Sequence, residues 1–287
     1  MDNLKGVWLP IITPFYHDKI DYQSYKDLID FYSDKGIAGI IPNGTTGECP
    51  TIEDFEFEEL LDKTVEFNHN RLPIYYGLGG NHTSKILKQL KTVEKYKIEG
   101  ILSVSPYYSR PDQKGIYEHF KAISEATNLK IIIYNIPYRT GRNIENETLY
   151  KLAELENIVG VKDSSGNINQ TMELIFNKPK NFAVLTGEDI LFYLNLVLGG
   201  DGGILAASHL QTEKFISIQK AVESNDHKSA LETWKSIEKF IPLLFKEPNP
   251  GPIKHYLLKK GLIKSSEVRL PLTEISDGLK QELSKYM

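Results

Sequence analysis

The chain has 287 residues, of which 40% are hydrophobic and 25% charged, and its formal net charge is -4. This composition is that of an ordinary globular protein, and its acidic balance offers no basic face to nucleic acid or to an anionic membrane. The single cysteine, Cys49, excludes an intrachain disulfide and suits a reducing cytoplasm. No signal peptide and no membrane span of about 18 apolar residues are predicted.

Short apolar runs alternate with longer amphipathic stretches along the chain. Each run is brief, rich in β-branched or aromatic residues, and bounded by Gly, Pro or Asn, which is typical of a strand. Strands are predicted at Val7–Thr13, Gly39–Pro42, Leu72–Gly77, Gly100–Ser105, Ile131–Asn135, Ile158–Lys162, Phe182–Thr186 and Gly203–Ala206.

The stretches between these runs have the spacing of amphipathic helices. Helices are predicted at Tyr22–Lys35, Ile52–Glu66, Thr83–Tyr96, Lys114–Ala126, Asn146–Glu154, Asn169–Phe176, Asp189–Leu198, within Glu213–Leu244, at Pro252–Lys260 and around Leu279–Tyr286. In the first helix one face carries Tyr25, Leu28, Ile29 and Tyr32. Thr51 is expected to cap the second helix.

The alternation of strands and helices predicts an α/β fold with a parallel sheet and right-handed crossovers. Eight strands indicate a closed (β/α)8 barrel, and an open doubly wound sheet is the alternative. We expect residues 1–225 to form the barrel and residues 226–287 to form a C-terminal helical extension packed on it.

Polar residues follow several of the predicted strands, and in a parallel barrel the chemistry collects at these carboxyl ends. They stand at positions 42–48, 105–108, 134–141, 162–166 and 186–189. The seven histidines are scattered, without the HxH or HExxH spacing of a metal site. No GxGxxG follows a strand and no Walker loop is present, so we expect neither a metal nor a cofactor.

Lys162 ends a predicted buried strand, and three interpretations are open. The lysine could extend along the surface into water, or it could pair with the adjacent Asp163, although neighbours in a strand face opposite sides. It could also be a Schiff-base nucleophile. That role requires the pKa of its amine to fall by about three units from about 10.4, which burial inside a barrel can supply.

Four motifs resemble those of the dihydrodipicolinate synthase family, within the pyruvate-dependent class I aldolases that include N-acetylneuraminate lyase. The motifs are GTTGE at 44–48, YNIPYRTG at 134–141, GVKDSSG at 160–166 and EPNPGPIK at 247–254. The resemblance covers essentially the whole chain. It implies a barrel homotetramer, a dimer of dimers, whose small-molecule substrates pyruvate and aspartate semialdehyde condense in lysine biosynthesis.

The resemblance also implies roles for individual residues. Lys162 matches the Schiff-base lysine and Tyr134 matches the tyrosine that moves protons beside the imine. Thr45 and Tyr108 match its relay partners, and Tyr108 is expected to come from a neighbouring subunit. Without these roles, Tyr134 is a core aromatic residue and Thr45 caps a turn.

The substrate-binding positions follow from the same resemblance. Thr46 matches the site for the pyruvate carboxylate, and Arg139 matches the arginine that receives the carboxylate of the aldehyde. Gly187 and Ile204 match backbone positions that line the site. The alternative for Arg139 is an ion pair with Glu145 or Glu147.

Three features bear on which reaction the chain performs. Sialic acid lyases typically lack the Arg-Thr-Gly run at 139–141 and carry serine where this chain has Thr45, so both features favour the synthase. Tyr138 departs from the synthase pattern, in which a small residue is common. The alternatives are another pyruvate aldolase, for sialic acid or a keto-deoxy sugar acid, and a non-catalytic pyruvate sensor.

A further departure concerns inhibition by lysine. Asn81 and Tyr107 match the inhibitor site of lysine-regulated members of the family. Lys85, however, stands where an acidic residue is expected, and Phe57 stands where a histidine is expected. Because a cation facing a cationic ligand weakens binding, we expect weak or absent inhibition by lysine.

Overall fold

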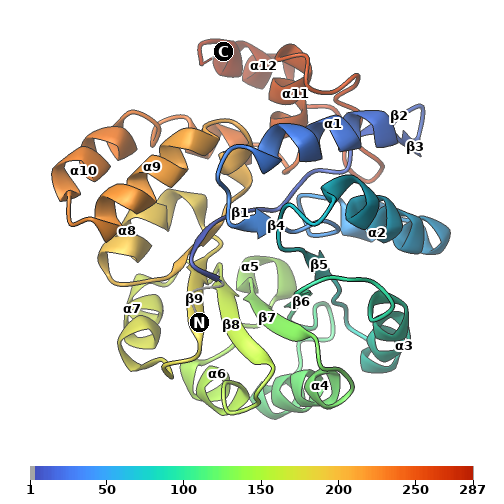
Figure 1. Cartoon of the computed structure of the whole chain (residues 1–287), viewed down its shortest axis with the longest axis vertical. Helices are drawn as coiled ribbons and strands as arrows, with labels where there is room; N and C mark the ends of the chain where they lie inside the picture. Colours follow the sequence, from blue (N-terminus) through green and yellow to red (C-terminus); the bar gives the residue numbers. More distant parts are fainter. Residues whose placement is uncertain (1–3, 287) are drawn as a thin grey trace. The chain divides into compact units, whose positions relative to one another are not determined.

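The computed structural model describes residues 4–286, which form two compact units (Figure 1). The first unit contains residues 4–6 and 74–204, and the second contains residues 7–73 and 205–286. No helix among the described residues is long and apolar enough to cross a membrane.

The first unit is built around parallel strands in the order β10-β9-β8-β7-β6-β5. Their bounds are β5 Tyr75–Gly77, β6 Gly100–Val104, β7 Lys130–Asn135, β8 Ile158–Asp163, β9 Ala183–Thr186 and β10 Gly202–Ile204. The strands are rich in Ile and Val and almost wholly buried, as expected of a parallel sheet. Register places Tyr134 beside Lys162, and Lys162 beside Leu185.

Helices follow the strands of the first unit, and most of them cover one side of its sheet (Figure 1). They are α3 Thr83–Val93, α4 Gln113–Glu125, α5 Pro137–Thr140, α6 Asn146–Leu152, α7 Ile168–Asn177, the 3-10 turn η3 Asp189–Leu191 and α8 Phe192–Val197. The side chain of Asn167 caps α7 by accepting from the Gln170 N–H. This cap starts the helix directly after the loop that ends β8.

The second unit holds β1 Gly6–Leu9 from its second residue onward, paired in parallel with β4 Gly39–Ile40, and the antiparallel hairpin β2 Phe15–Tyr16 and β3 Lys19–Ile20. Gly39 permits the pairing, because a Cβ there would meet the Trp8 ring and lie 2.6 Å from the carbonyl oxygen of Pro73. The parallel strands of both units amount to the eight that the sequence predicts.

The second unit also contains every described helix beyond residue 204, together with earlier helices from residues 7–73. Its helices are α1 Tyr22–Ser33, α2 Asp54–Asn68, α9 Thr212–Glu223, α10 His227–Lys235, α11 Gly251–Lys259 and α12 Asp277–Ser284, with 3-10 turns η2 Cys49–Thr51, η4 Ala206–His209 and η5 Ile241–Phe245. The predicted apolar face of α1 is confirmed, since Tyr25, Leu28, Ile29 and Tyr32 are all buried.

The predicted cap of α2 is wrong. The helix begins at Asp54, and its N-cap is Glu53, which forms a capping box with Glu56. The Thr51 hydroxyl instead donates to the carbonyl oxygen of Glu48, 3.0 Å away, within η2. The hairpin β2–β3 and the short helix α5 were not predicted. The boundary between barrel and extension at residue 225 stays a prediction.

Candidate active site

Lys162 is the buried amine of the first unit. It lies on β8 with only 6% of its surface exposed. Burial lowers its pKa from the usual 10.5 to about 8, against the opposing pull of the Asp189 and Glu188 carboxylates. The surface interpretation of this lysine is therefore wrong, and its amine is partly neutral at physiological pH.

The Tyr134 side chain lies directly beside the Lys162 amine. The Lys162 Nζ lies 4.2 Å from the centre of the Tyr134 ring, because the two residues are register partners on β7 and β8. Tyr134 is 6% exposed, so the amine and the phenol share one buried environment. A phenol beside a neutral amine can exchange protons with groups that form on that amine.

Asp163 is not the partner of Lys162. Its carboxylate accepts hydrogen bonds from the Ser165 N–H at 3.0 Å, the Ser165 hydroxyl at 3.1 Å and the Thr171 hydroxyl at 2.5 Å. These donors belong to the loop after β8 and to α7. The alternation of side chains along the strand therefore sends Asp163 to the opposite face from Lys162.

Gly187 lies directly after β9 and packs against the lysine side chain. A Cβ at this position would lie 2.6 Å from the Lys162 Cε and would also collide with the Ser164 hydroxyl. The structure thus brings Gly187 to the lysine, and only a glycine leaves the side chain room to lie there. Ile204, at the end of β10, is fully buried in the same unit.

Two acidic residues near the lysine were not singled out in the sequence. Asp189 is 4% exposed, and both it and Glu188 favour the charged form of Lys162. Burial raises the pKa of the Glu188 carboxyl, and the positive charge of Lys162 partly offsets that rise. The signal for both residues was their position directly after a strand. Adjacent carboxylates keep the lysine pKa from falling further.

Arg139 lies in the short helix α5, directly after β7. Its side chain is exposed, and its Cζ lies 5.3 Å from the centre of the Tyr138 ring. The Arg139 charge lowers the pKa of Lys162 and that of Glu188, so it acts on the site electrostatically. An exposed guanidinium of this kind can receive a carboxylate.

Tyr108 is not buried with the lysine. It is 90% exposed and adopts a positive φ of 69° in the loop after β6. A phenol so exposed is available to a second molecule. The expectation that Tyr108 serves a neighbouring subunit stays a prediction.

Thr45 and Thr46 belong to the second unit, in the turn after β4. The Glu48 N–H donates to the Thr45 carbonyl oxygen at 3.1 Å, and the Cys49 N–H donates to the Gly44 carbonyl oxygen at 3.2 Å. Thr46 is 3% exposed, whereas Thr45 is only half-buried. The turn is thus compact and presents two neighbouring hydroxyl groups.

Comparison with known proteins shows the family. Residues 3–287 match the dihydrodipicolinate synthetase family. The chain is 58% identical over 284 residues to 4-hydroxy-tetrahydrodipicolinate synthase 2 of Clostridium acetobutylicum, with 99% of both chains covered. A crystal structure of dihydrodipicolinate synthase from Aquifex aeolicus is similar with a TM-score of 0.94 and 35% identity, covering 99% of this chain and 98% of that one.

A third relative is the chloride inhibited dihydrodipicolinate synthase from Acinetobacter baumannii, complexed with pyruvate. Its TM-score is 0.95 at 32% identity, with 98% of this chain and 97% of that chain covered. These matches confirm the predicted α/β fold, a (β/α)8 barrel with a C-terminal helical extension, and the predicted enzyme class, a lyase. The chain belongs to the dihydrodipicolinate synthetase family.

Proposed function

We propose that the chain condenses pyruvate with L-aspartate 4-semialdehyde through a Schiff base on Lys162, giving 4-hydroxy-tetrahydrodipicolinate in lysine and diaminopimelate biosynthesis. The observation that carries this proposal is the buried Lys162 amine, 4.2 Å from the Tyr134 ring centre, in a chain 58% identical to a named synthase. The single free Cys49 supports a cytoplasmic location.

The chemistry begins with the neutral amine. It attacks the ketone carbon of pyruvate, and water leaves to form an iminium that withdraws electrons from the adjacent methyl group. The methyl loses a proton, and the resulting enamine carbon attacks the aldehyde. The amine of the aldehyde substrate then displaces Lys162 and closes the ring, so the balance is one water released.

Side chains divide the remaining work. Tyr134 moves protons at the iminium, with Thr45 and the Tyr108 of a neighbouring copy as relay partners. Thr46 receives the pyruvate carboxylate, and Gly187 and Ile204 line the site. The second carboxylate meets Arg139, whose planar guanidinium matches carboxylate geometry. Tyr138, 66% exposed beside Arg139, shapes the aldehyde side.

The active assembly in this proposal is a homotetramer, a dimer of dimers. Apolar side chains on the helices α7 and α8 and beside them support self-association, since they are exposed in the single chain. They are Ile168, Met172, Phe176, Ile190, Leu194 and Val197. Light scattering on the purified protein measures the assembly directly, and a stable monomer would contradict it.

Borohydride reduction in the presence of pyruvate tests the Schiff base. Intact mass should show one pyruvate adduct per chain, located on Lys162, and Lys162→Ala should abolish both the adduct and turnover, a loss of at least about 10³-fold. Lys178→Ala serves as the control, since Lys178 pairs with Asp201 and neither residue is among the groups that shift the pKa of Lys162. Normal turnover by Lys162→Ala would overturn the mechanism.

Substrate choice is tested by comparing aspartate semialdehyde with N-acetylmannosamine. We expect turnover only with the semialdehyde. Turnover with the sugar alone would make the chain a sugar acid aldolase, and an adduct without turnover of either would favour a pyruvate sensor.

A further inference from the structure

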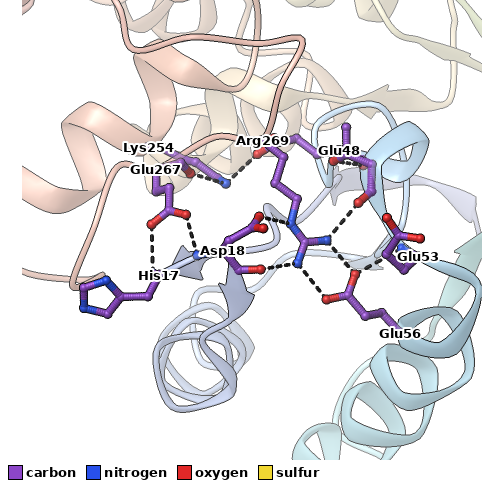
Figure 2. Close-up of polar contacts among 9 residues, drawn as sticks. His17, Asp18, Glu48, Glu53, Glu56, Lys254, Glu267 and Arg269 are labelled. Carbon is purple, nitrogen blue, oxygen red and sulfur yellow. Dashed lines mark hydrogen bonds and ion pairs between the residues drawn. The ribbon is translucent and has the colours of Figure 1, made fainter.

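A buried ion pair lies behind the turn at residues 44–48 in the second unit (Figure 2). The Lys254 Nζ lies 2.5 Å from a Glu48 carboxylate oxygen, and the two side chains are 0% and 1% exposed. Burying such a pair costs several kcal/mol of lost hydration per ion, so an apolar pair of the same size often gives equal stability. Such a pair is therefore weak evidence for stability, and it can instead fix the geometry of the segments that carry it.

The C-terminal part of the second unit holds this pair from several sides. Lys254 also donates to the carbonyl oxygen of Glu267 at 2.8 Å, and its Nζ lies 4.2 Å from the centre of the Phe15 ring. The other carboxylate oxygen of Glu48 accepts from the Arg269 N–H at 3.1 Å. Both oxygens of Glu48 are thus fixed by residues more than two hundred positions later in the chain.

Arg269 is itself locked in place (Figure 2). Its guanidinium donates to both oxygens of Glu56, at 2.5 and 2.7 Å, and to the carbonyl oxygen of Thr51 at 2.8 Å. A bidentate pair of this geometry is rigid as well as strong. The backbone N–H that holds Glu48 therefore comes from an immobilised residue.

The anchored residue sits at the strained end of the turn. Glu48 adopts φ 56°, a left-handed conformation that is unfavourable for a residue other than glycine. Its own N–H closes the turn onto Thr45, and the Gly47 carbonyl oxygen accepts from the Thr13 hydroxyl at 2.8 Å. The side-chain contacts of Glu48 thus help to hold the backbone that carries both threonines.

A second contact reaches the turn at Thr46. The Asn249 Nδ2 donates to the Thr46 Oγ1 at 2.9 Å, and the two residues are 8% and 3% exposed. Because this N–H occupies a lone pair of the hydroxyl oxygen, the hydroxyl hydrogen is left to donate elsewhere. A carboxylate oxygen can accept this hydrogen bond from the Thr46 hydroxyl, whereas a ligand group that has only N–H or O–H donors and no acceptor cannot.

We propose that Asn249 and Lys254 are positioning residues for the pyruvate carboxylate subsite, Asn249 by directing the Thr46 hydroxyl and Lys254 by holding the turn through Glu48. The inference rests on the proposed function, because it takes Thr46 as the group that meets pyruvate. It assigns a role to the EPNPGPIK motif, in which both residues lie.

A double-mutant cycle tests the Asn249 half. Asn249→Leu removes the donor at similar volume, and we expect the KM for pyruvate to rise about 10-fold with kcat changed by less than about 3-fold. Thr46→Val should raise the same KM at least as much, and the double variant should be no worse than Thr46→Val. If the increase in KM for pyruvate in the double variant equals the product of the two single increases, the two residues act independently and the proposed role of Asn249 is wrong.

The Lys254 half needs a paired change, because Lys254→Met alone leaves Glu48 charged and buried and can prevent folding. Glu48→Gln with Lys254→Met removes both charges. We expect this variant to fold and its KM for pyruvate to be about 10-fold higher than that of the wild type. At saturating pyruvate, borohydride should trap the Schiff base on Lys162 as fully as in the wild type. An unchanged KM would leave the pair with a structural role only.

Lys178→Met is the matched control, because Lys178 pairs with the mostly buried Asp201 in the first unit. It should lower the unfolding temperature and leave the pyruvate KM unchanged. The wild-type protein separates the two proposals. No borohydride adduct on Lys162 would overturn the proposed function, whereas an adduct together with unchanged KM values in the Asn249 and paired variants would overturn this inference alone.

Discussion

At the scale of single residues, the proposed chemistry depends on the protonation of one amine. Lys162 is predictable from the sequence as a charged residue at the end of an apolar run. Its pKa of about 8 is not, since burial and the carboxylates of Glu188 and Asp189 balance only in the folded chain. At pH 7 the shift raises the neutral fraction from roughly one in 3,000 to about one in ten.

The rate of Schiff-base formation should therefore follow the neutral amine. Because the pKa is lowered, the rate should rise as the pH rises, approach its plateau just above pH 8, and stay level toward pH 10.5. Quenching with borohydride at timed intervals, at saturating pyruvate and from about pH 6 to about pH 10, measures this rate. A rate still climbing tenfold per pH unit above pH 9 would mean an amine with an ordinary pKa.

At the scale of elements, strands and helices with a clear period were predictable and very short ones were not. The runs around β7 and β8 were recognised because several apolar residues stand together. The two-residue strands β2 and β3 carry no measurable period, and the Thr51 cap failed because Glu53 and Glu56 cap each other instead. Which of several nearby polar side chains caps a helix depends on the local backbone geometry, and the amino-acid composition does not determine that geometry.

The junction after β9 carries a prediction at this scale. The Gly187 N–H donates to the Asp163 carbonyl oxygen at 2.8 Å, so the chain continues the pairing of β9 with β8 past the strand end. Gly187→Ala should push on the Lys162 side chain and slow pyruvate trapping at least about tenfold. Gly278→Ala in α12 is the control, because its Cβ would meet only the Ser276 Oγ at 3.9 Å. Equal trapping rates in the two variants would contradict the close packing at Gly187.

At the scale of the whole molecule, the sequence indicated the fold class through the alternation of elements, and its motifs, by resemblance to a family, indicated candidate catalytic residues. It could not indicate the support behind the 44–48 turn. Asn249 and Thr46 are 203 positions apart, and Lys254 stands in the apolar run of α11, where its pattern is that of a helix. Contacts of such long range depend on the complete fold, so they become visible only in the structure.

The assembly carries the last prediction, because in the proposed function the exposed Tyr108 acts in the site of a neighbouring copy. If each site takes Lys162 from one chain and Tyr108 from its partner, then Lys162→Ala and Tyr108→Phe should each be nearly inactive alone. In a mixed dimer the Tyr108→Phe chain supplies the lysine and the Lys162→Ala chain supplies the phenol, so one of the two sites is complete.

Random reassociation of equal amounts should therefore restore about a quarter of the wild-type sites, since half of the dimers are mixed and each has one complete site. The measurement is turnover of the two variants after unfolding and refolding together, against the same variants refolded separately and then combined. If Tyr108 acts within its own chain, no mixed dimer contains a complete site. The co-refolded sample would then be no more active than the separate ones.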